Sequence, residues 1–326
     1  MDKQGKCLVQ KKVSRKKFTQ VVAQLKCDEI VMEACAGSNH WFRVFTQLGH
    51  KVKLISPQFV RPHVKTNKND YQDAQGICEA AARANMVFVQ PKDLARQDIQ
   101  TLHRLRQGYV EERTALINRL RGLLAEYGVV MPIGISNARK SVPKILSSEL
   151  GQGELSVLSL ELVADLWDFF KQVDQKVKDC DKRVDALCQQ YEPCQLLASI
   201  PGVGSLIATA LYAQLGEVSF FANGRHVSAY LGLVPRQHSS GGKDRLLGIS
   251  KRGNTYLRTL LIHGARALIR HAKDKEDRYS RWINQLHCHK AYNQVAVALA
   301  NKMARIAWAI LHSRKPFDIS QAGGVA

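Results

Sequence analysis

The stretch "EIVMEACAGSNHWFRVFTQLGHKVKLISP" (residues 29–57) decides the fold of the N-terminal part of the chain. Its first six residues, 29–34, are a short apolar run of the kind that forms a buried strand. Residues 39–49 have a helical pattern that ends at Gly49, and glycine commonly follows the last turn of a helix. Residues 51–57 read as a second strand closed by a proline. Strand, helix and strand in this order predict an α/β unit.

The neighbouring segments continue this alternation. Residues 7–13 have a strand pattern, and Ser14 can cap the helix that follows them. A further helix contains Asp73, and residues 86–91 ("MVFVQP") read as another strand. We therefore expect residues 1–92 to form an α/β layer with a largely parallel sheet.

The rest of the chain is predicted to be helical. In residues 93–192, apolar side chains recur every seven residues at Leu102, Tyr109, Leu116 and Leu123, and between 166 and 187 they alternate spacings of four and three. This is the pattern of a coiled-coil seam, which fits an intramolecular helical hairpin and a dimerisation arm equally well. Residues 193–326 form a third, mainly helical region.

The charge of the chain points to its partner. The 326 residues carry a formal net charge of +20, a surplus that indicates a polyanion, most commonly nucleic acid. An anionic membrane surface fits less well, because the basic residues are spread along the chain and form no amphipathic stripe; no membrane partner is expected. The eight cysteines include no Cys-x-x-Cys pair, which is typical of reduced thiols in the cytosol.

Three acidic residues are candidates for a metal site. Glu33 ends the first strand pattern, where α/β proteins place their sites. Asp70 and Asp73 lie three residues apart at a helix start and can share one face. Carboxylates suit Mg²⁺, and two such ions about 4 Å apart stabilise the attacking and leaving oxygens of phosphoryl transfer. The alternative for the aspartates is a helix-start role alone, since acids favour that end of the dipole.

Two glycine-containing stretches of the third region are candidates for binding and chemistry. "IPGVG" (200–204) precedes an apolar helix, and Gly202 and Gly204 can let backbone N–H groups approach a phosphate, as in helix-hairpin-helix modules; an ordinary tight turn is the alternative. In "HSSGGKDRLLGISKRGNTYLR" (238–258) a serine among cations could attack a phosphodiester, although no nearby residue is an obvious general base and flexible basic loops are common. The candidate cationic contacts to nucleic acid are Lys65, Lys68, Arg236, Lys243, Arg245, Lys251, Arg252 and Arg258.

Taken together and in order, six stretches resemble the transposases of the IS-one-ten family, and most closely its IS-eleven-eleven subgroup. They are "MEAC" (32–35), "KTNKNDYQDA" (65–74), "LINRLRGLLAEYG" (116–128), "LLASIPGVGSLIATAL" (196–211), "YLGLVPRQHSSGGKDRLLGISKRGNTYLR" (230–258) and "VAVALANKMARIAWAIL" (295–311).

This resemblance implies three domains and a set of catalytic residues. It implies a RuvC-like (RNase H fold) domain over residues 1–92 with an Asp-Glu-Asp-Asp metal site, a coiled-coil arm over 93–192, and a C-terminal transposase domain over 193–326. The family's glutamate falls on Glu33 and its paired aspartates on Asp70 and Asp73. Its serine, in a Pro-Arg-x-x-x-Ser-Gly pattern, falls on Ser240, which leaves Ser239 as a bystander.

The resemblance also implies an activity and its partners. Members are Mg²⁺-dependent recombinases that exchange strands of donor and target DNA through a covalent serine–DNA link, guided by a structured RNA, in the bacterial cytoplasm at the nucleoid. Dimers pair into tetramers, so that the carboxylates of one subunit act with the serine of another. Two other functions stay open: a RuvC-type junction nuclease without a covalent intermediate, and a non-catalytic truncated copy that only binds nucleic acid.

The chain departs from the family pattern at its start. Family members open with two further strands, the first of which carries a Gly-x-Asp motif that supplies the first metal-binding aspartate, whereas this sequence starts at "MDKQGK". We therefore expect a metal site with three of its four carboxylates, a strand at 29–34 that is unpaired on one side, and impaired strand transfer.

Overall fold

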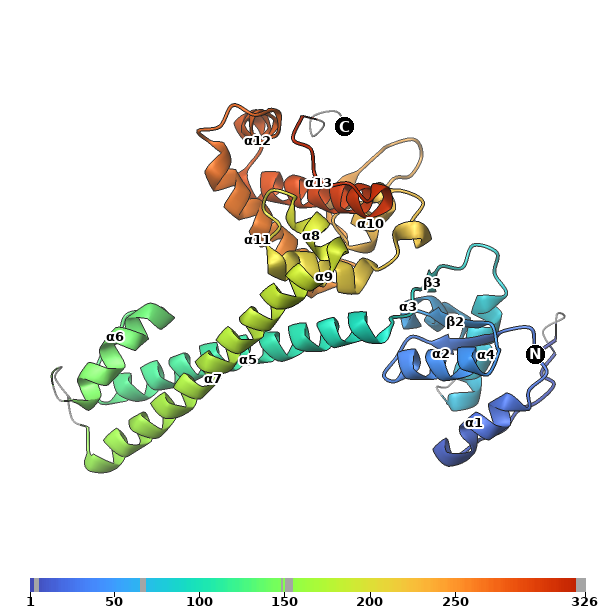
Figure 1. The fold of residues 1–326 in the computed structure, drawn as a ribbon, viewed down its shortest axis with the longest axis horizontal. Helices are drawn as coiled ribbons and strands as arrows, with labels where there is room; N and C mark the ends of the chain where they lie inside the picture. The colour runs from blue at the N-terminus through green and yellow to red at the C-terminus, as the bar shows by residue number, and fades with distance from the viewer. Residues whose placement is uncertain (3–5, 65–68, 148, 150–154, 321–326) are drawn as a thin grey trace. The chain divides into compact units, whose positions relative to one another are not determined.

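The computed structural model describes residues 1–326 with the exception of 3–5, 65–68, 148, 150–154 and 321–326 (Figure 1). The chain divides into an N-terminal unit, Met1–Leu94, and a C-terminal unit, Ala95–Ala326. The C-terminal unit contains both the long helices of the predicted arm and the helical region that follows them.

The N-terminal unit is built on a three-stranded sheet in the order β1 (Ile30–Glu33), β2 (Val52–Ile55) and β3 (Phe88–Val89). Strands β1 and β2 are parallel with Ile30 opposite Val52, and α2 (Ser38–Gln47) connects them, which confirms the predicted strand–helix–strand unit. Strand β3 pairs antiparallel with β2, so the expected parallel arrangement holds for β1 and β2 only. Among the described residues strand β1 is bonded to β2 alone, and it forms an edge of this sheet, as expected.

The strand predicted at residues 7–13 is wrong. These residues are irregular, and Leu8 and Val9 are 65% and 70% exposed. The physical reason is that a strand needs a neighbour to satisfy its backbone groups, and residues 7–13 pair with none of the strands in the described part of the chain. Helix α1 (Arg15–Ala23) follows as predicted, with Ser14 at its N-cap position but without a hydrogen bond from the serine side chain.

Small apolar clusters hold the N-terminal unit together. Phe18 of α1 meets Trp41 and Phe45 of α2 edge to face, with ring centroids 4.9 and 5.2 Å away. A second cluster joins Ile55 to buried residues of α3 (Pro57–Val60) and α4 (Asp70–Ala81), with the short 3₁₀ helix η1 (Arg61–His63) between these two helices. Helix α4 packs against β1, which places the start of α4 and the end of β1 in one small structural unit.

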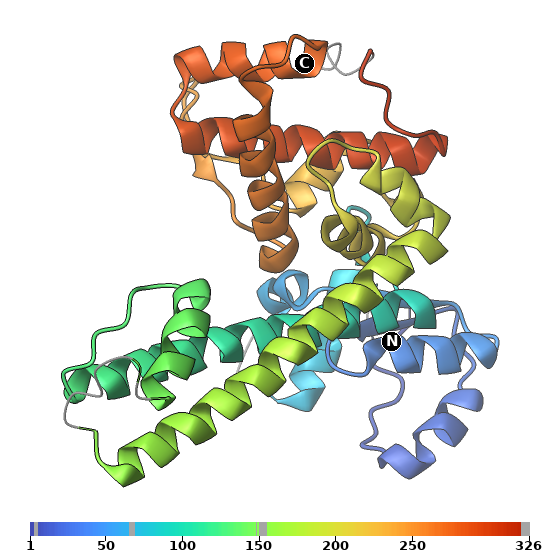
Figure 2. The same cartoon turned by 60° about the vertical axis from the view of Figure 1, so that its left-hand side comes forward.

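The arm of the C-terminal unit consists of α5 (Leu94–Glu126), α6 (Ile135–Leu146) and α7 (Val157–Gln190). Figures 1 and 2 both show α5 and α7 as long helices running in opposite directions, with α6 beside their far end. The predicted seam is buried between helices of the same chain, including Leu116 of α5 and Phe170 and Val173 of α7. Of the two arrangements considered, the structure shows the intramolecular hairpin for these residues.

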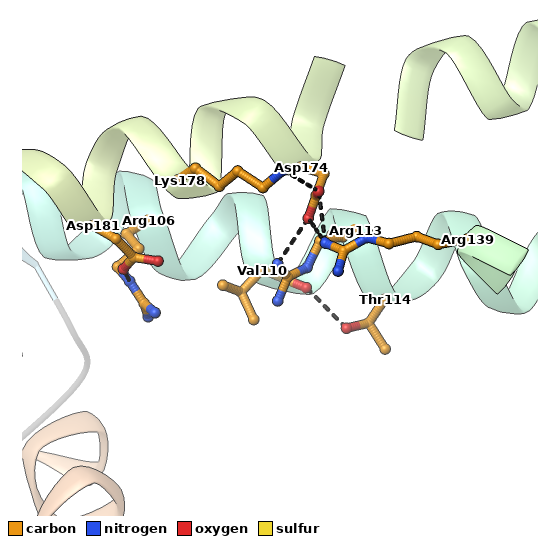
Figure 3. Close-up of polar contacts among 8 residues, drawn as sticks. All are labelled: Arg106, Val110, Arg113, Thr114, Arg139, Asp174, Lys178 and Asp181. Carbon is orange, nitrogen blue, oxygen red and sulfur yellow. Dashed lines mark hydrogen bonds and ion pairs between the residues drawn. The ribbon is translucent and has the colours of Figure 1, made fainter. Parts of the chain in front are cut away.

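One buried carboxylate fixes the three arm helices. Asp174 of α7 accepts hydrogen bonds from Arg113 of α5 at 3.0 Å and from Arg139 of α6 at 2.7 and 2.8 Å, and Lys178 Nζ lies 3.3 Å away (Figure 3). Burial raises the pKa of Asp174, but the hydrogen bonds from Arg139, Arg113 and Lys178 outweigh it and leave the pKa below its usual value.

The remaining helices pack around α13 (Tyr292–Ser313), whose residues Val295, Leu299 and Met303 are fully buried. The other elements are α8 (Glu192–Ala198), α9 (Ser205–Leu215), η2 (Val218–Phe220), α10 (Gly224–Tyr230), β4 (Pro235–Gln237), β5 (Leu246–Ile249), α11 (Thr255–Ala272) and α12 (Arg278–His289). Helix α13 is long and apolar enough to cross a membrane, but 56% of its most apolar window is buried within the protein, as in the central helix of a folded domain.

A buried histidine joins the arm to these helices. His103 of α5 lies 2.9 Å from both the Thr209 hydroxyl and the Tyr256 hydroxyl. Thr209 donates to the Ser205 carbonyl oxygen at 2.7 Å, so it accepts from His103 Nε2, and His103 Nδ1 then accepts from Tyr256. Burial, with a smaller contribution from nearby Arg106, lowers the pKa of His103 to about 4. The junction is therefore held by a neutral imidazole.

Candidate functional site

The predicted acidic residues lie on two elements that pack together. Glu33 is the last residue of β1, while Asp70 and Asp73 occupy the first turn of α4. Asn69, and neither aspartate, caps this helix: its side chain accepts hydrogen bonds from the backbone N–H groups of Tyr71 and Gln72. The helix cap is therefore Asn69, and the two aspartates add favourable charge at the helix start.

The chemistry of these three residues suits a hard divalent cation. All three are carboxylates, and none of them has a side-chain hydrogen bond or ion pair with any residue in the described ranges. Nevertheless, within those ranges no three His, Cys, Asp or Glu side chains lie close enough together to hold a metal ion. The donor set thus fits Mg²⁺ in type, and the three residues stay predicted ligands.

The predicted serine lies at the tip of a β-hairpin formed by β4 and β5. Lys243 N–H donates to the Ser240 carbonyl oxygen at 3.1 Å, and Gly241 and Gly242 between them have φ values of +56° and +75°. Two consecutive residues with positive φ are the requirement of a type I′ turn, which explains the Gly-Gly pair. The turn leaves Ser240 exposed at the end of the hairpin.

The two serines of the hairpin differ in their bonding. Ser239 Oγ accepts hydrogen bonds from the Gln237 side chain at 2.9 Å and from Arg245 N–H at 3.4 Å, and the same Gln237 amide donates to Asp244 at 3.2 Å. The hydroxyl of Ser240 makes no hydrogen bond with any described residue. Ser239 thus stabilises the hairpin, while the Ser240 hydroxyl stays available. Sequence reasoning missed Gln237 and Asp244, which carry no signal apart from their place in the hairpin.

Five of the predicted cations occupy exposed positions of the hairpin and of its base: Arg236, Lys243, Arg245, Lys251 and Arg252. Arg258 differs from them. It is 6% exposed, and its guanidinium donates to the carbonyl oxygens of Leu231 and Arg252 at 3.0 and 2.9 Å. Arg258 therefore fixes the base of the hairpin and is not available to a nucleic acid. Lys65 and Lys68 lie outside the described residues.

The base of the hairpin is a close crossing of two backbone segments. A Cβ atom on Gly253 would clash with the carbonyl oxygen of Tyr230, and one on Gly232 would clash with the backbone of Arg252. Only glycine permits this approach. Together with Arg258, the crossing ties the hairpin to the core helices at both of its ends, so its position is set by packing.

The "IPGVG" stretch forms the turn between α8 and α9. Gly202 lies against α11, where an added Cβ would come within 2.9 Å of the Gly264 carbonyl oxygen, so this glycine has a packing role. Gly204 is exposed at the N-cap of α9, and its carbonyl oxygen accepts the first hydrogen bonds of the helix. The structure thus has the tight turn that one interpretation predicted, and it also has an exposed helix start, which the phosphate-binding interpretation requires.

Comparison with known proteins identifies the family. The family model DEDD_Tnp_IS110, described as a transposase, matches residues 1–129, and the model of the transposase IS116/IS110/IS902 family matches residues 194–280. The chain is 47% identical to the transposase for insertion sequence element IS1111A of Coxiella burnetii over 317 residues, which cover 97% of this chain and 86% of that protein.

Further relatives extend this similarity. A probable family 20 transposase of Pseudomonas aeruginosa is 41% identical over 95% of this chain and 92% of its own length. A pilin gene-inverting protein of Moraxella bovis is 24% identical over 82% of this chain and 75% of its own length. The family matches and the coverage of these relatives agree, and the chain belongs to the IS110/IS116/IS902 family of insertion-sequence transposases.

Proposed function

We propose that this chain exchanges DNA strands through a covalent intermediate on Ser240. The observation that carries the proposal is the hairpin tip, where an unbonded serine hydroxyl lies among exposed cations while its neighbour Ser239 is engaged in the turn. In the reaction, Ser240 Oγ forms a bond to phosphorus, the bond from phosphorus to the leaving sugar oxygen breaks, and the serine proton passes to a base. Arg236, Lys243 and Arg245 stabilise the charge that develops on the phosphate oxygens.

The acidic residues supply the second part of the proposal. We assign Glu33, Asp70 and Asp73 as ligands of Mg²⁺, supported by their carboxylate chemistry and their place on packed elements of a DEDD transposase domain. A divalent ion held there would polarise a phosphate oxygen. The residues of this chain have the task of presenting their carboxylates to the ion, and none of the three is paired with a described residue.

The partners in this proposal are donor and target DNA, a structured guide RNA and further copies of the same chain. The net charge of +20 supports the nucleic-acid partners. An apolar stripe on the outside of α7, formed by Leu158, Leu162 and Phe169 with exposures of 64, 46 and 46%, supports self-association through the arm. The subunits of a dimer or tetramer could then combine the carboxylates of one copy with the serine of another.

Denaturing electrophoresis of reactions with end-labelled DNA, guide RNA and Mg²⁺ tests the covalent step. We expect the unaltered chain to form a protein–DNA adduct, Ser240→Ala to abolish it, and Ser239→Ala to retain it with modest loss. Cleavage that survives Ser240→Ala without an adduct would identify a junction nuclease instead. Binding without cleavage, unchanged by Asp70→Ala, would identify a non-catalytic nucleic-acid-binding protein.

The comparison is made against the unaltered chain. Asp70→Asn and Asp73→Asn are expected to lower adduct formation without weakening nucleic-acid binding, because they remove a ligand charge and add none.

A further inference from the structure

A groove of about 890 Å³ lies at the opposite end of helix α13 from Tyr292. It is lined by the start of α10, by the last turns of α13 and by the segment that follows α13. Gly224 sets one wall, since a Cβ on it would lie 2.9 Å from the backbone of Arg305, so α10 and α13 are in direct backbone contact. The groove forms where these elements pack together, and none of its described lining residues belongs to the serine hairpin.

The charged lining of the groove is almost entirely basic. Its cations are Arg225, Lys302, Arg305 and Lys315, and its one carboxylate is Asp318. Asp318 accepts hydrogen bonds from the N–H and hydroxyl of Ser320 at 2.9 and 2.7 Å, which hold its carboxylate but leave its charge, so four cations face one carboxylate among the described lining residues. The electrostatic character of the groove is therefore that of an anion site.

Lys302 is the strongest indication of a ligand. It is 6% exposed, and its ammonium group lies 4.1 Å from the ring centroid of Trp282 and 5.5 Å from that of Tyr279. In the described part of the chain no carboxylate or other acceptor is bonded to it. Burial, with Arg305 and Arg278 nearby, lowers the pKa of Lys302. The two ring faces offset part of the cost of burying this cation, and a bound anion would supply the counter-charge that the described residues do not.

The floor of the groove narrows the choice of anion. Ile306, Trp308 and Phe317 contribute apolar surface, and the Trp308 ring is fixed because its N–H donates to the Phe221 carbonyl oxygen at 3.1 Å. A duplex keeps its base faces stacked inside and presents phosphates, sugars and base edges, so its bases cannot stack on an apolar floor. An unpaired strand presents bases to such a floor and phosphates to the rim.

We propose that this groove binds a single-stranded segment of nucleic acid, with phosphates on Arg225, Arg305, Lys315 and Lys302 and bases against Trp308 and Phe317. The inference rests on the proposed function in one respect, namely that the ligand is a nucleic acid. It adds a second binding surface that is separate from the hairpin and serves a strand that is unpaired during the reaction. RNA and DNA share this chemistry, and the experiment separates them.

Fluorescence anisotropy with labelled oligo-U, oligo-dT and a duplex of equal length, each about 12 nucleotides long, tests the groove. Arg225→Ala/Lys315→Ala removes two exposed cations from the rim, and Arg270→Ala/Lys273→Ala removes two exposed cations of the same unit that do not line it. We expect the rim variant to bind the single strands about tenfold more weakly and to lower the salt slope by about 1.4, since each phosphate contact to a single strand contributes about 0.7.

We expect the rim variant and the control variant to bind the duplex with the same affinity. We also expect the control variant to change single-strand affinity by less than about threefold. If only oligo-U binding depends on the rim cations, the groove binds RNA. If only oligo-dT binding depends on them, the groove binds single-stranded DNA. Equal weakening by rim and control variants, or equal weakening for duplex and single strands, would overturn the proposal.

Lys302→Met provides a second variant that does not depend on the rim. Methionine fills a similar volume without the charge, so we expect an unchanged or higher melting temperature together with about fivefold weaker single-strand binding, the loss of about one phosphate contact. A purely structural lysine would leave binding unchanged. The adduct assay on Ser240 is independent of both variants, so failure of the groove and failure of the covalent mechanism are distinguishable.

Discussion

Replacing Asp174 by asparagine is expected to destabilise the arm more than any surface charge of α7. The Asp174 carboxylate is 6% exposed, and its partners Arg113, Arg139 and Lys178 are 20, 46 and 57% exposed. Breaking a buried ion pair from one side costs about 3–5 kcal/mol. Two of the three cations can be rehydrated, so we expect a loss of about 3 kcal/mol, at the lower end of that range. Most of this loss in stability comes from Arg113, because its Nε is already buried without a partner among the described residues.

Thermal unfolding followed by circular dichroism measures this loss. For a unit of this size, a loss of about 3 kcal/mol corresponds to a decrease of about 6 to 12 °C in melting temperature. The matched control is Asp168→Asn on the same helix, whose ion pair with Lys171 is 65 and 59% exposed on its two sides; it should cost less than about 0.5 kcal/mol. Equal melting temperatures for the two variants would refute the assignment of Asp174 as the residue that fixes α5, α6 and α7.

The remaining predictions concern the junction and the arm surface. Because burial lowers the pKa of His103 to about 4 from the ordinary value of 6.5, the unfolded chain takes up a proton that the folded chain does not bind, and stability decreases as the pH falls from about 6.5 to about 4, by up to roughly 3 kcal/mol. In urea titrations His103→Gln should be less stable at neutral pH but should lack this decrease, and an unchanged pH dependence would contradict the neutral-imidazole assignment. On the arm, Phe169→Glu should reduce the sedimentation mass of the assembled chain towards that of a monomer, whereas Asp168→Asn should not, and identical assemblies would exclude the α7 stripe.

Local patterns predicted the N-terminal unit correctly wherever a partner lies close in the sequence. The apolar run before Glu33 and the run ending at Ile55 form parallel strands because one helix connects them directly. The strand predicted at residues 7–13 was wrong because a strand pattern forms a strand only beside a neighbouring strand. The local sequence does not specify whether such a neighbour is present. The sheet position of Phe88 likewise depends on its antiparallel pairing with Ile55, which no local signal specifies.

The candidate site shows the same limit in its side chains. The Ser-Ser-Gly-Gly-Lys motif contains the two glycines that a type I′ turn requires, so the exposed serine could be predicted. Counting cations could not separate Arg258 from Arg252, because one lies inside α11 against backbone carbonyls and the other on the surface. The burial of Lys302 could not be predicted from the sequence either. Within an apolar helix pattern a single lysine indicates a surface position, and nothing local indicates a buried cation beside Trp282.

The distribution of charge explains why a surplus of +20 is compatible with a stable fold. In the arm, Asp174 neutralises part of the charge of three cations, and Arg106 pairs with Asp181 at 2.5 Å. The hairpin and the groove have fewer counter-charges: the hairpin carries five exposed cations and one carboxylate, Asp244, and the carboxylate among the described groove residues is Asp318. Like charges gathered without counter-charges repel one another and lower stability. In our proposal, their persistence at two surfaces of one unit reflects two separate stretches of polyanion, a strand to be cut at the hairpin and an unpaired strand held in the groove.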